Sequence, residues 1–148
     1  MIVVSESATG NDIKHLDAKV KSFDEMISEV DIITFHNKLS EKSKYIINSE
    51  SLSRMKQNAI IINCARGGII NEADMKDALN NNQISGYGCD VYEKEPQTDS
   101  IFSGMENVLM TPHIGAGTSE AQEKVAVQIA EQVSDFLINN NIVNQVKP

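Results

Sequence analysis

A parallel, doubly wound α/β sheet is the fold class that the sequence predicts, on three observations. Short apolar runs alternate along the chain with segments of helical periodicity, and this alternation is typical of parallel sheets with helical crossovers. The run 58–63 holds three consecutive isoleucines before Asn63, and such continuous hydrophobicity predicts a strand buried on both faces. Hydrophobic residues make up 41% of the 148 residues, which is enough to build a core.

The elements follow in order along the chain. Strands are expected at the apolar runs 2–4, 31–36, 58–63, 86–91 and 108–110. Helices are expected at 24–30, 49–55, 71–79 and about 118–138. Ser49 is the expected N-cap of the second helix and Asn71 of the third. The last helix carries an apolar stripe typical of an amphipathic helix, formed by Val125, Ile129, Val133, Phe136 and Leu137.

The start of the sheet departs from the usual pattern. A dinucleotide-binding sheet of this Rossmann-like kind opens with a strand, a G-x-G-x-x-G loop and a helix whose N-terminus holds the pyrophosphate. No such segment precedes Ile2. Gly115-Ala116-Gly117 is superficially similar, but Glu120 stands at the third glycine position and would repel a pyrophosphate, so we expect a tight turn. The sheet is therefore expected to be incomplete, lacking its first strand and glycine loop.

Charge and cysteine content narrow the class of protein. A net charge of −8 argues against a nucleic-acid or anionic-membrane partner, because phosphate binding needs a basic surface. No run approaches the ~18 apolar residues of a membrane span, and the N-terminus lacks the features of a signal peptide, so a cytoplasmic protein is expected. Cys64 and Cys89 match no metal spacing; they lie in strand-like segments and are expected to be buried, reduced thiols.

Three side chains suggest a chemistry. Arg66, Glu95 and His113 each follow an apolar run that is predicted to be a strand. Ligands bind beyond the carboxyl ends of strands in open α/β sheets, so the three can converge at one edge. A guanidinium holds a substrate carboxylate with two parallel hydrogen bonds, a histidine carries a proton near neutral pH, and a carboxylate orients that histidine. This set suits the reversible reduction of a 2-keto acid. Taken alone, Arg66 and His113 are better explained by an ordinary structural role, and Glu95 could simply be a solvated residue.

Three motifs contain these side chains: Asn63-Cys64-Ala65-Arg66-Gly67-Gly68-Ile69-Ile70-Asn71-Glu72, Gly88-Cys89-Asp90-Val91-Tyr92-Glu93-Lys94-Glu95-Pro96 and Thr111-Pro112-His113-Ile114-Gly115-Ala116. Together they resemble the D-isomer-specific 2-hydroxyacid dehydrogenases. The resemblance implies that Arg66 anchors the substrate, that Glu95 orients the histidine, and that His113 donates and accepts the proton. It further implies NAD as the cofactor, with contacts from Glu6, His36, Cys64, Asp90, Gly115 and Ala116.

Within that family the closing runs 131–137 and 143–146 look most like D-3-phosphoglycerate dehydrogenases. Glu95 argues against formate dehydrogenases, which carry glutamine there. Lys38 departs from the family, which usually has proline in this turn. We expect residues 1–140 to be a partial NAD-binding domain and 141–148 to be a tail leading toward a substrate domain absent from this chain. The expected substrate is a small anionic 2-hydroxy or 2-keto acid, 3-phosphoglycerate among the candidates, and the full-length form is expected to be a homodimer.

Two other interpretations stay open. Some relatives of this fold act as dinucleotide-responsive corepressors, so the chain could be a binding module without catalysis. It could also be an inactive truncated product, since a sheet without its central first strand exposes apolar edges that normally pair. On either the enzymatic or the truncated interpretation, the isolated chain is expected to be unstable or inactive.

Overall fold

The computed structural model describes residues 1–4, 11 and 13–145. The chain divides into two compact units, Met1–Pro112 and His113–Pro148. Each unit has its own internal contacts, and each is described by itself below.

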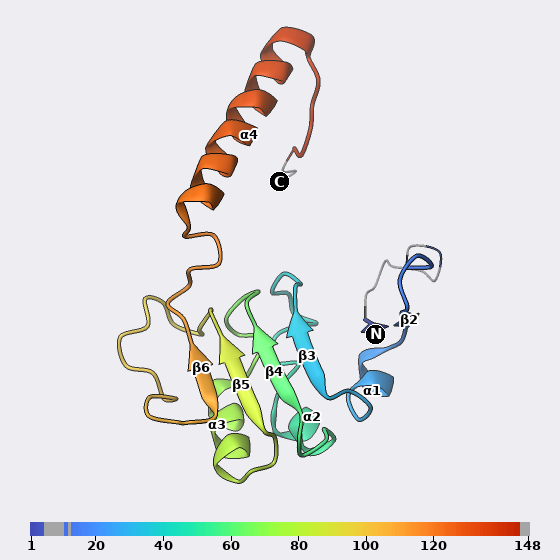
Figure 1. The fold of residues 1–148 in the computed structure, drawn as a ribbon, viewed down its shortest axis with the longest axis vertical. Helices are drawn as coiled ribbons and strands as arrows, with labels where there is room; N and C mark the ends of the chain where they lie inside the picture. The colour runs from blue at the N-terminus through green and yellow to red at the C-terminus, as the bar shows by residue number, and fades with distance from the viewer. Residues whose placement is uncertain (5–10, 12, 146–148) are drawn as a thin grey trace. The chain divides into compact units, whose positions relative to one another are not determined.

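A four-stranded parallel sheet forms the centre of the first unit (Figure 1). Its strands are β3 (Ile32–Phe35), β4 (Ile60–Asn63), β5 (Gly86–Cys89) and β6 (Val108–Met110), hydrogen-bonded in that order. The strands are in step, because Phe35 pairs with Asn63, Asn63 with Cys89, and Cys89 with Met110. The carboxyl ends of all four strands therefore form one row, which positions the residues that follow them.

A second, two-stranded parallel sheet pairs β1 (Ile2–Val3) with β2 (Lys19–Val20). The sequence predicts β1 but not β2. The reason is local: β2 has only two residues, one of them a lysine, and both are exposed, so it carries no apolar run to reveal it.

The described residues of the first unit also form three helices, α1 (Phe23–Met26), α2 (Ser49–Ser53) and α3 (Glu72–Asn80). Asn71 caps α3 as predicted, its side chain accepting from the Asp74 N–H at 3.1 Å. The predicted cap of α2 is wrong by one position. Asn48, not Ser49, holds the extended N-cap conformation, accepts from the Ser51 N–H at 3.1 Å and forms a capping box with that serine.

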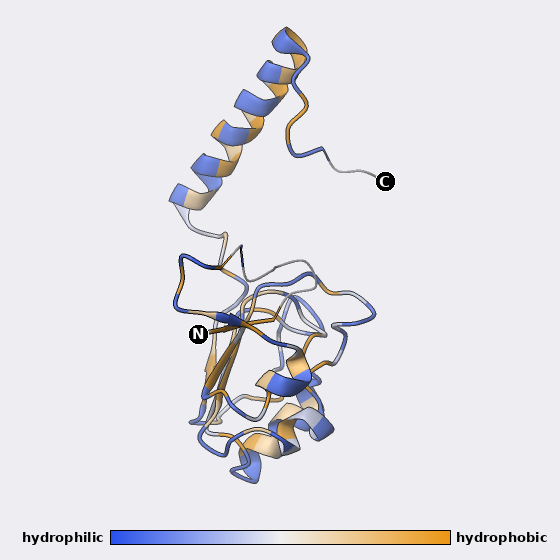
Figure 2. Ribbon diagram, turned by 90° about the vertical axis from the view of Figure 1, so that its right-hand side faces the viewer, coloured by the Kyte–Doolittle hydropathy of each residue, from blue (hydrophilic) through white to orange (hydrophobic). Residues whose placement is uncertain are grey.

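The core lies on one face of the four-stranded sheet. Burial alternates along β3 and β4, so that Ile33 and Ile61 point inward while Ile32 is 59% and Ile60 is 39% exposed. Figure 2 shows the first unit with its strands seen edge-on and its helices on one side. The expectation that segment 58–63 is buried on both faces is thus wrong within this unit, where helices cover a single face. The fully buried side chains of this core include Ile27, Ile47, Leu52, Ile61, Ile69, Met75 and Phe102.

The second unit is dominated by the predicted long helix, α4 (Ser119–Asn139). Thr118 caps it by accepting from the Ala121 N–H at 3.2 Å, and Asn140 ends it in the left-handed conformation with φ 53°. Apolar residues recur from turn to turn along α4, as expected for an amphipathic helix (Figure 2), and none of its residues is buried. Among the described residues, no helix has the length and hydrophobicity needed to cross a membrane.

Candidate active site

The row of strand ends places four polar or reactive residues at one edge of the sheet. His36, Cys64, Asp90 and Thr111 directly follow β3, β4, β5 and β6. Because the strands end in register, these residues occupy equivalent positions on neighbouring strands. Three of them, His36, Cys64 and Asp90, are positions that the sequence resemblance assigns to cofactor binding.

Hydrogen bonds tie the ends of β5 and β6 together. Thr111 donates its hydroxyl to Oδ1 of Asp90 at 2.6 Å, and Asp90 is only 5% exposed. Tyr92 donates its hydroxyl to the Thr111 carbonyl at 2.7 Å. Burial raises the pKa of Tyr92 to about 12, so this hydroxyl keeps its proton and remains a donor at neutral pH. The sequence gives no signal for these roles of Thr111 and Tyr92.

The turn that carries Arg66 is shaped by Asn63. The Asn63 side chain is 1% exposed; its Nδ2 donates to the Arg66 carbonyl at 2.9 Å and its Oδ1 accepts from the Ala65 N–H at 3.1 Å. The buried amide thus supplies the hydrogen bonds that a backbone turn at a strand end would otherwise lack. The Arg66 side chain is exposed, and its Nη1 donates to the Ala65 carbonyl at 2.6 Å.

Gly67 brings the Arg66 turn against the loop that carries Glu95. A Cβ on Gly67 would lie 1.7 Å from the Tyr92 carbonyl oxygen, so only glycine permits this approach. Within the same loop, the Tyr92 N–H donates a hydrogen bond to Oε1 of Glu95 at 3.0 Å. A cis peptide bond joins Glu95 to Pro96. The structure therefore carries Arg66 and Glu95 on two loops in direct backbone contact.

His113 begins the second unit, where its backbone has φ 54°. This left-handed conformation is uncommon outside glycine, asparagine, aspartate and histidine. Gly115 and Ala116 follow in the predicted turn into α4, closed by a bond from the Gly117 N–H to the Ile114 carbonyl at 2.9 Å. The convergence of His113 with Arg66 and Glu95 stays a prediction, because His113 belongs to a different unit from the other two residues. Glu6, expected to contact the cofactor, lies outside the described residues.

The two cysteines differ from each other. Cys89 is buried as expected, and burial raises the pKa of its thiol to about 11, which keeps it protonated and unreactive at neutral pH. Cys64 is exposed, so the expectation of two buried thiols is wrong for this one. Its position explains the error, because Cys64 stands one residue beyond the end of β4 and outside the pleated segment.

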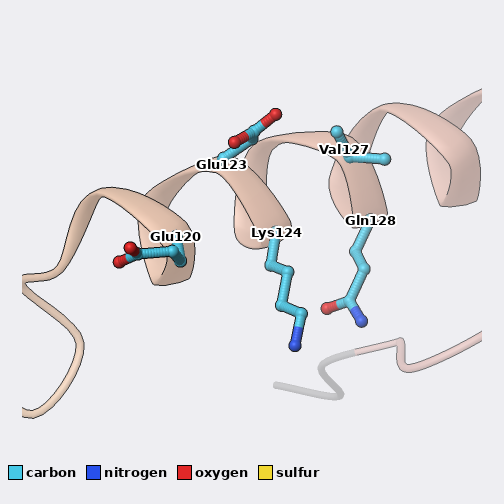
Figure 3. A pocket seen from close by; sticks show the side chains of 5 residues that line it. All are labelled: Glu120, Glu123, Lys124, Val127 and Gln128. Carbon is cyan, nitrogen blue, oxygen red and sulfur yellow. The ribbon is translucent and has the colours of Figure 1, made fainter.

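Other places offer less for a ligand. No group of three or more metal-ligating side chains gathers among the described residues. A shallow depression on the second unit is lined by Glu120, Glu123, Lys124, Val127 and Gln128 (Figure 3). All of these side chains come from α4, so the depression is the surface of one helix and lacks the convergent polar groups of a ligand site.

Residues 1–115 match the family described as the D-isomer specific 2-hydroxyacid dehydrogenase, NAD binding domain. The chain belongs to this family. D-3-phosphoglycerate dehydrogenase of Bacillus subtilis (strain 168) is 41% identical over 123 residues, which are 83% of this chain and 23% of that protein.

Solved structures of the family share the fold. A glyoxylate reductase from Paecilomyes thermophila superposes with a TM-score of 0.87 at 28% identity, over 98% of this chain and 44% of that one. The NAD-complexed D-isomer specific 2-hydroxyacid dehydrogenase of Lactobacillus delbrueckii ssp. bulgaricus gives a TM-score of 0.82 at 25% identity, over 99% of this chain and 48% of that one. The chain thus spans about a quarter of the curated relative and less than half of each solved one.

NAD is the cofactor of this family. The strand-end row, formed by His36, Cys64, Asp90 and Thr111, suits the nicotinamide end of that molecule. Asp90 presents a nearly buried carboxylate, and a carboxylate is the acceptor that a carboxamide NH₂ group needs. No G-x-G-x-x-G segment for a pyrophosphate occurs in the sequence. The residues present therefore fit one end of the cofactor.

Proposed function

We propose that this chain supplies the NAD-binding domain, and the residues that perform catalysis, of a dehydrogenase that interconverts D-2-hydroxy acids and 2-keto acids. The observation that carries the proposal is the backbone contact between the Arg66 turn and the Glu95 loop beside the strand-end row of a family member. Both loops follow strands at the sheet edge where open α/β folds bind ligands, which supports a role for the Arg66 cation and the Glu95 carboxylate there.

Each proposed role follows from the chemistry of the side chain. Arg66 holds the substrate carboxylate, because a guanidinium offers two parallel N–H donors to two carboxylate oxygens. Its exposure leaves the guanidinium accessible to a small acid. Asp90 and the backbone near Cys64 bind the carboxamide of the nicotinamide, with Thr111 holding Asp90 in place through the 2.6 Å hydrogen bond. His36, Gly115 and Ala116 contribute further contacts to the cofactor.

The proton is handled by His113 and Glu95. When bound, NAD accepts or supplies the hydride at C2 of the substrate. In the reducing direction His113 gives its proton to the oxygen of the former carbonyl, which becomes the hydroxyl of the product. Glu95 stabilises the protonated imidazole and orients it, as a carboxylate does for histidine in other general acid–base pairs.

The substrate is a small 2-keto or 2-hydroxy acid, with 3-phosphoglycerate favoured by the similarity to D-3-phosphoglycerate dehydrogenase. The glyoxylate reductase among the structural relatives acts, by its name, on a different acid. A substrate panel therefore has to include phosphorylated and unphosphorylated acids.

The proposal is tested in a chimera that carries this chain in place of the matched segment of the Bacillus subtilis relative. NADH oxidation is followed with a panel of 2-keto acids and with ketones of the same size that lack the carboxylate. We expect turnover only with the acids, and we expect Arg66→Ala to lower kcat/KM by about 10²-fold or more, because a charge-assisted bidentate contact is lost.

Lys14→Ala, which removes an exposed cation far from the site in sequence, is the matched control and is expected to leave kcat/KM unchanged. Equal turnover of acids and simple ketones, or an Arg66→Ala variant as active as its parent, would contradict the proposal. Circular dichroism of each variant establishes that the comparison is made between folded proteins.

A further inference from the structure

Two glutamates outside the proposed catalytic set join the loops of the site. The Glu72 N–H donates to Oε1 of Glu93 at 3.0 Å, and the Glu93 N–H donates to Oε1 of Glu72 at 2.8 Å. Each carboxylate thus accepts from the backbone of the other residue. Glu72 is the first residue of α3, and N–H groups at that position have no acceptor within the helix. We call this pair of hydrogen bonds the glutamate clamp.

A third contact connects the clamp with the Arg66 turn. Tyr45 donates its hydroxyl to Oε2 of Glu93 at 3.3 Å, and its N–H donates to the Gly68 carbonyl at 2.8 Å. The nearby charge of Glu93 raises the pKa of Tyr45, which keeps that hydroxyl a donor. Glu93 is therefore tied to the start of α3 by one oxygen and, through Tyr45, to the turn after Arg66 by the other.

The clamp acts on the peptide unit that touches Gly67. The Tyr92 carbonyl and the Glu93 N–H belong to the same peptide, and both lie over Gly67, within 1.7 Å and 2.9 Å of where a Cβ would stand. The N–H of that peptide donates to Glu72, and the N–H of Tyr92, which belongs to the preceding peptide, donates to Glu95. Fixing the Tyr92–Glu93 peptide therefore fixes the approach to Gly67 and restrains the adjoining Tyr92 N–H, to which the Glu95 carboxylate is hydrogen-bonded.

We propose that Glu72 and Glu93 are positioning residues that hold the Tyr92–Glu93 peptide over Gly67, so that Glu95 and Arg66 keep a fixed relation to each other. This inference rests on the proposed function for its catalytic meaning. The geometry of the clamp requires an acceptor oxygen at each position but no charge. Partial burial raises the pKa of Glu72, so the negative charge there is disfavoured while the acceptor oxygen is used.

The acceptor requirement gives a pair of matched substitutions at each position. Glu72→Gln and Glu93→Gln keep an acceptor oxygen, whereas Glu72→Ala and Glu93→Ala remove it. Glu106→Ala, at an exposed carboxylate outside this network, is the control. Amide hydrogen exchange is measured on this chain by NMR. The Tyr92 N–H reports on its hydrogen bond to Glu95, and the Ile62 N–H in β4 reports on global stability.

The clamp predicts that each alanine variant speeds exchange of the Tyr92 N–H by about fivefold to tenfold relative to Ile62, the loss expected for one hydrogen bond. Each glutamine variant and Glu106→Ala stay within about twofold of the parent. Unchanged exchange at Tyr92 in the alanine variants, with faster exchange at Glu72 alone, would show that the pair only caps α3 and would overturn the proposal. The proposal would also be overturned if the Tyr92 N–H exchanged as fast in a glutamine variant as in the matching alanine variant.

The catalytic consequence is measured in the chimera. Glu72→Ala is expected to lower kcat by about tenfold with KM for NADH unchanged, because a small displacement of reacting groups is costly while cofactor contacts are kept; Glu72→Gln restores kcat. An inactive parent chimera would refute the proposed function while the exchange experiment still decides the clamp. If the chimera is active and Glu72→Ala leaves its kcat unchanged, only the catalytic role of the clamp is refuted, and the proposed function stands.

Discussion

Gly67 is the residue on which the geometry of the site depends most directly. Its missing side chain lets the Tyr92 carbonyl approach to 1.7 Å from the position of a Cβ, and this contact joins the Arg66 turn to the Glu95 loop. We expect Gly67→Ala to destabilise the fold by about 3 kcal/mol, because the backbone of one loop has to move. Urea unfolding of the parent and the variant measures the difference.

Gly88→Ala is the control for this substitution. A Cβ on Gly88 meets nothing nearer than Ile62 at 3.9 Å, an ordinary van der Waals distance. The free energy of unfolding should change by less than about 1 kcal/mol, since removing a glycine from a strand costs nothing sterically here. Equal effects of the two substitutions would mean that the close contact at Gly67 does not govern the loop arrangement.

Single residues of the site differ in how well the sequence reveals them. Arg66, Glu95 and His113 are predicted as site residues because each follows an apolar run and has a side chain with a recognised chemistry. Asn63 and Thr111 carry no such signal, although they shape the Arg66 turn and hold Asp90. Their importance comes from hydrogen bonds to groups that are brought near by the fold, which a linear pattern does not contain.

The helices of the first unit are set by their caps. Asn48 closes α2 through a capping box with Ser51, and its Nδ2 also donates to the Tyr45 carbonyl at 2.9 Å. We expect Asn48→Ala to cost about 1 kcal/mol or more in the free energy of unfolding, and Ser49→Ala to cost almost nothing. Thermal and urea unfolding of the two variants distinguishes them, and a larger effect at Ser49 would mean that the cap is misplaced.

Elements with strong patterns follow the sequence well, and weak ones do not. β3, β4, β5, β6, α3 and α4 lie within about two residues of their expected ranges, since apolar runs or cap residues mark them. β2 is too short and polar to leave a pattern, and α1 ends at Met26 rather than Val30. The one-sided burial of β4 was missed because a run of isoleucines reports hydrophobicity, not which neighbours are present.

At the largest scale the chain divides into a sheet-bearing unit and a helical unit, with the boundary at the Pro112–His113 bond. The proposed chemistry needs groups from both, because Arg66 and Glu95 belong to the first and His113 to the second. Family membership and the aligned strand ends support the part of this requirement that concerns Arg66 and Glu95. The part that concerns His113 is predicted from the sequence, through the resemblance of Thr111-Pro112-His113 to the family.

The measurement that tests the central claim most directly is the kcat of His113→Asn in the chimera, together with its Kd for NADH from fluorescence titration. His15→Asn, at an exposed histidine outside the site, is the control. If His113 carries the proton, kcat falls by about 10³-fold, within the range for general acid–base catalysis, while the Kd for NADH changes less than about twofold. Turnover by His113→Asn equal to that of His15→Asn would contradict the account.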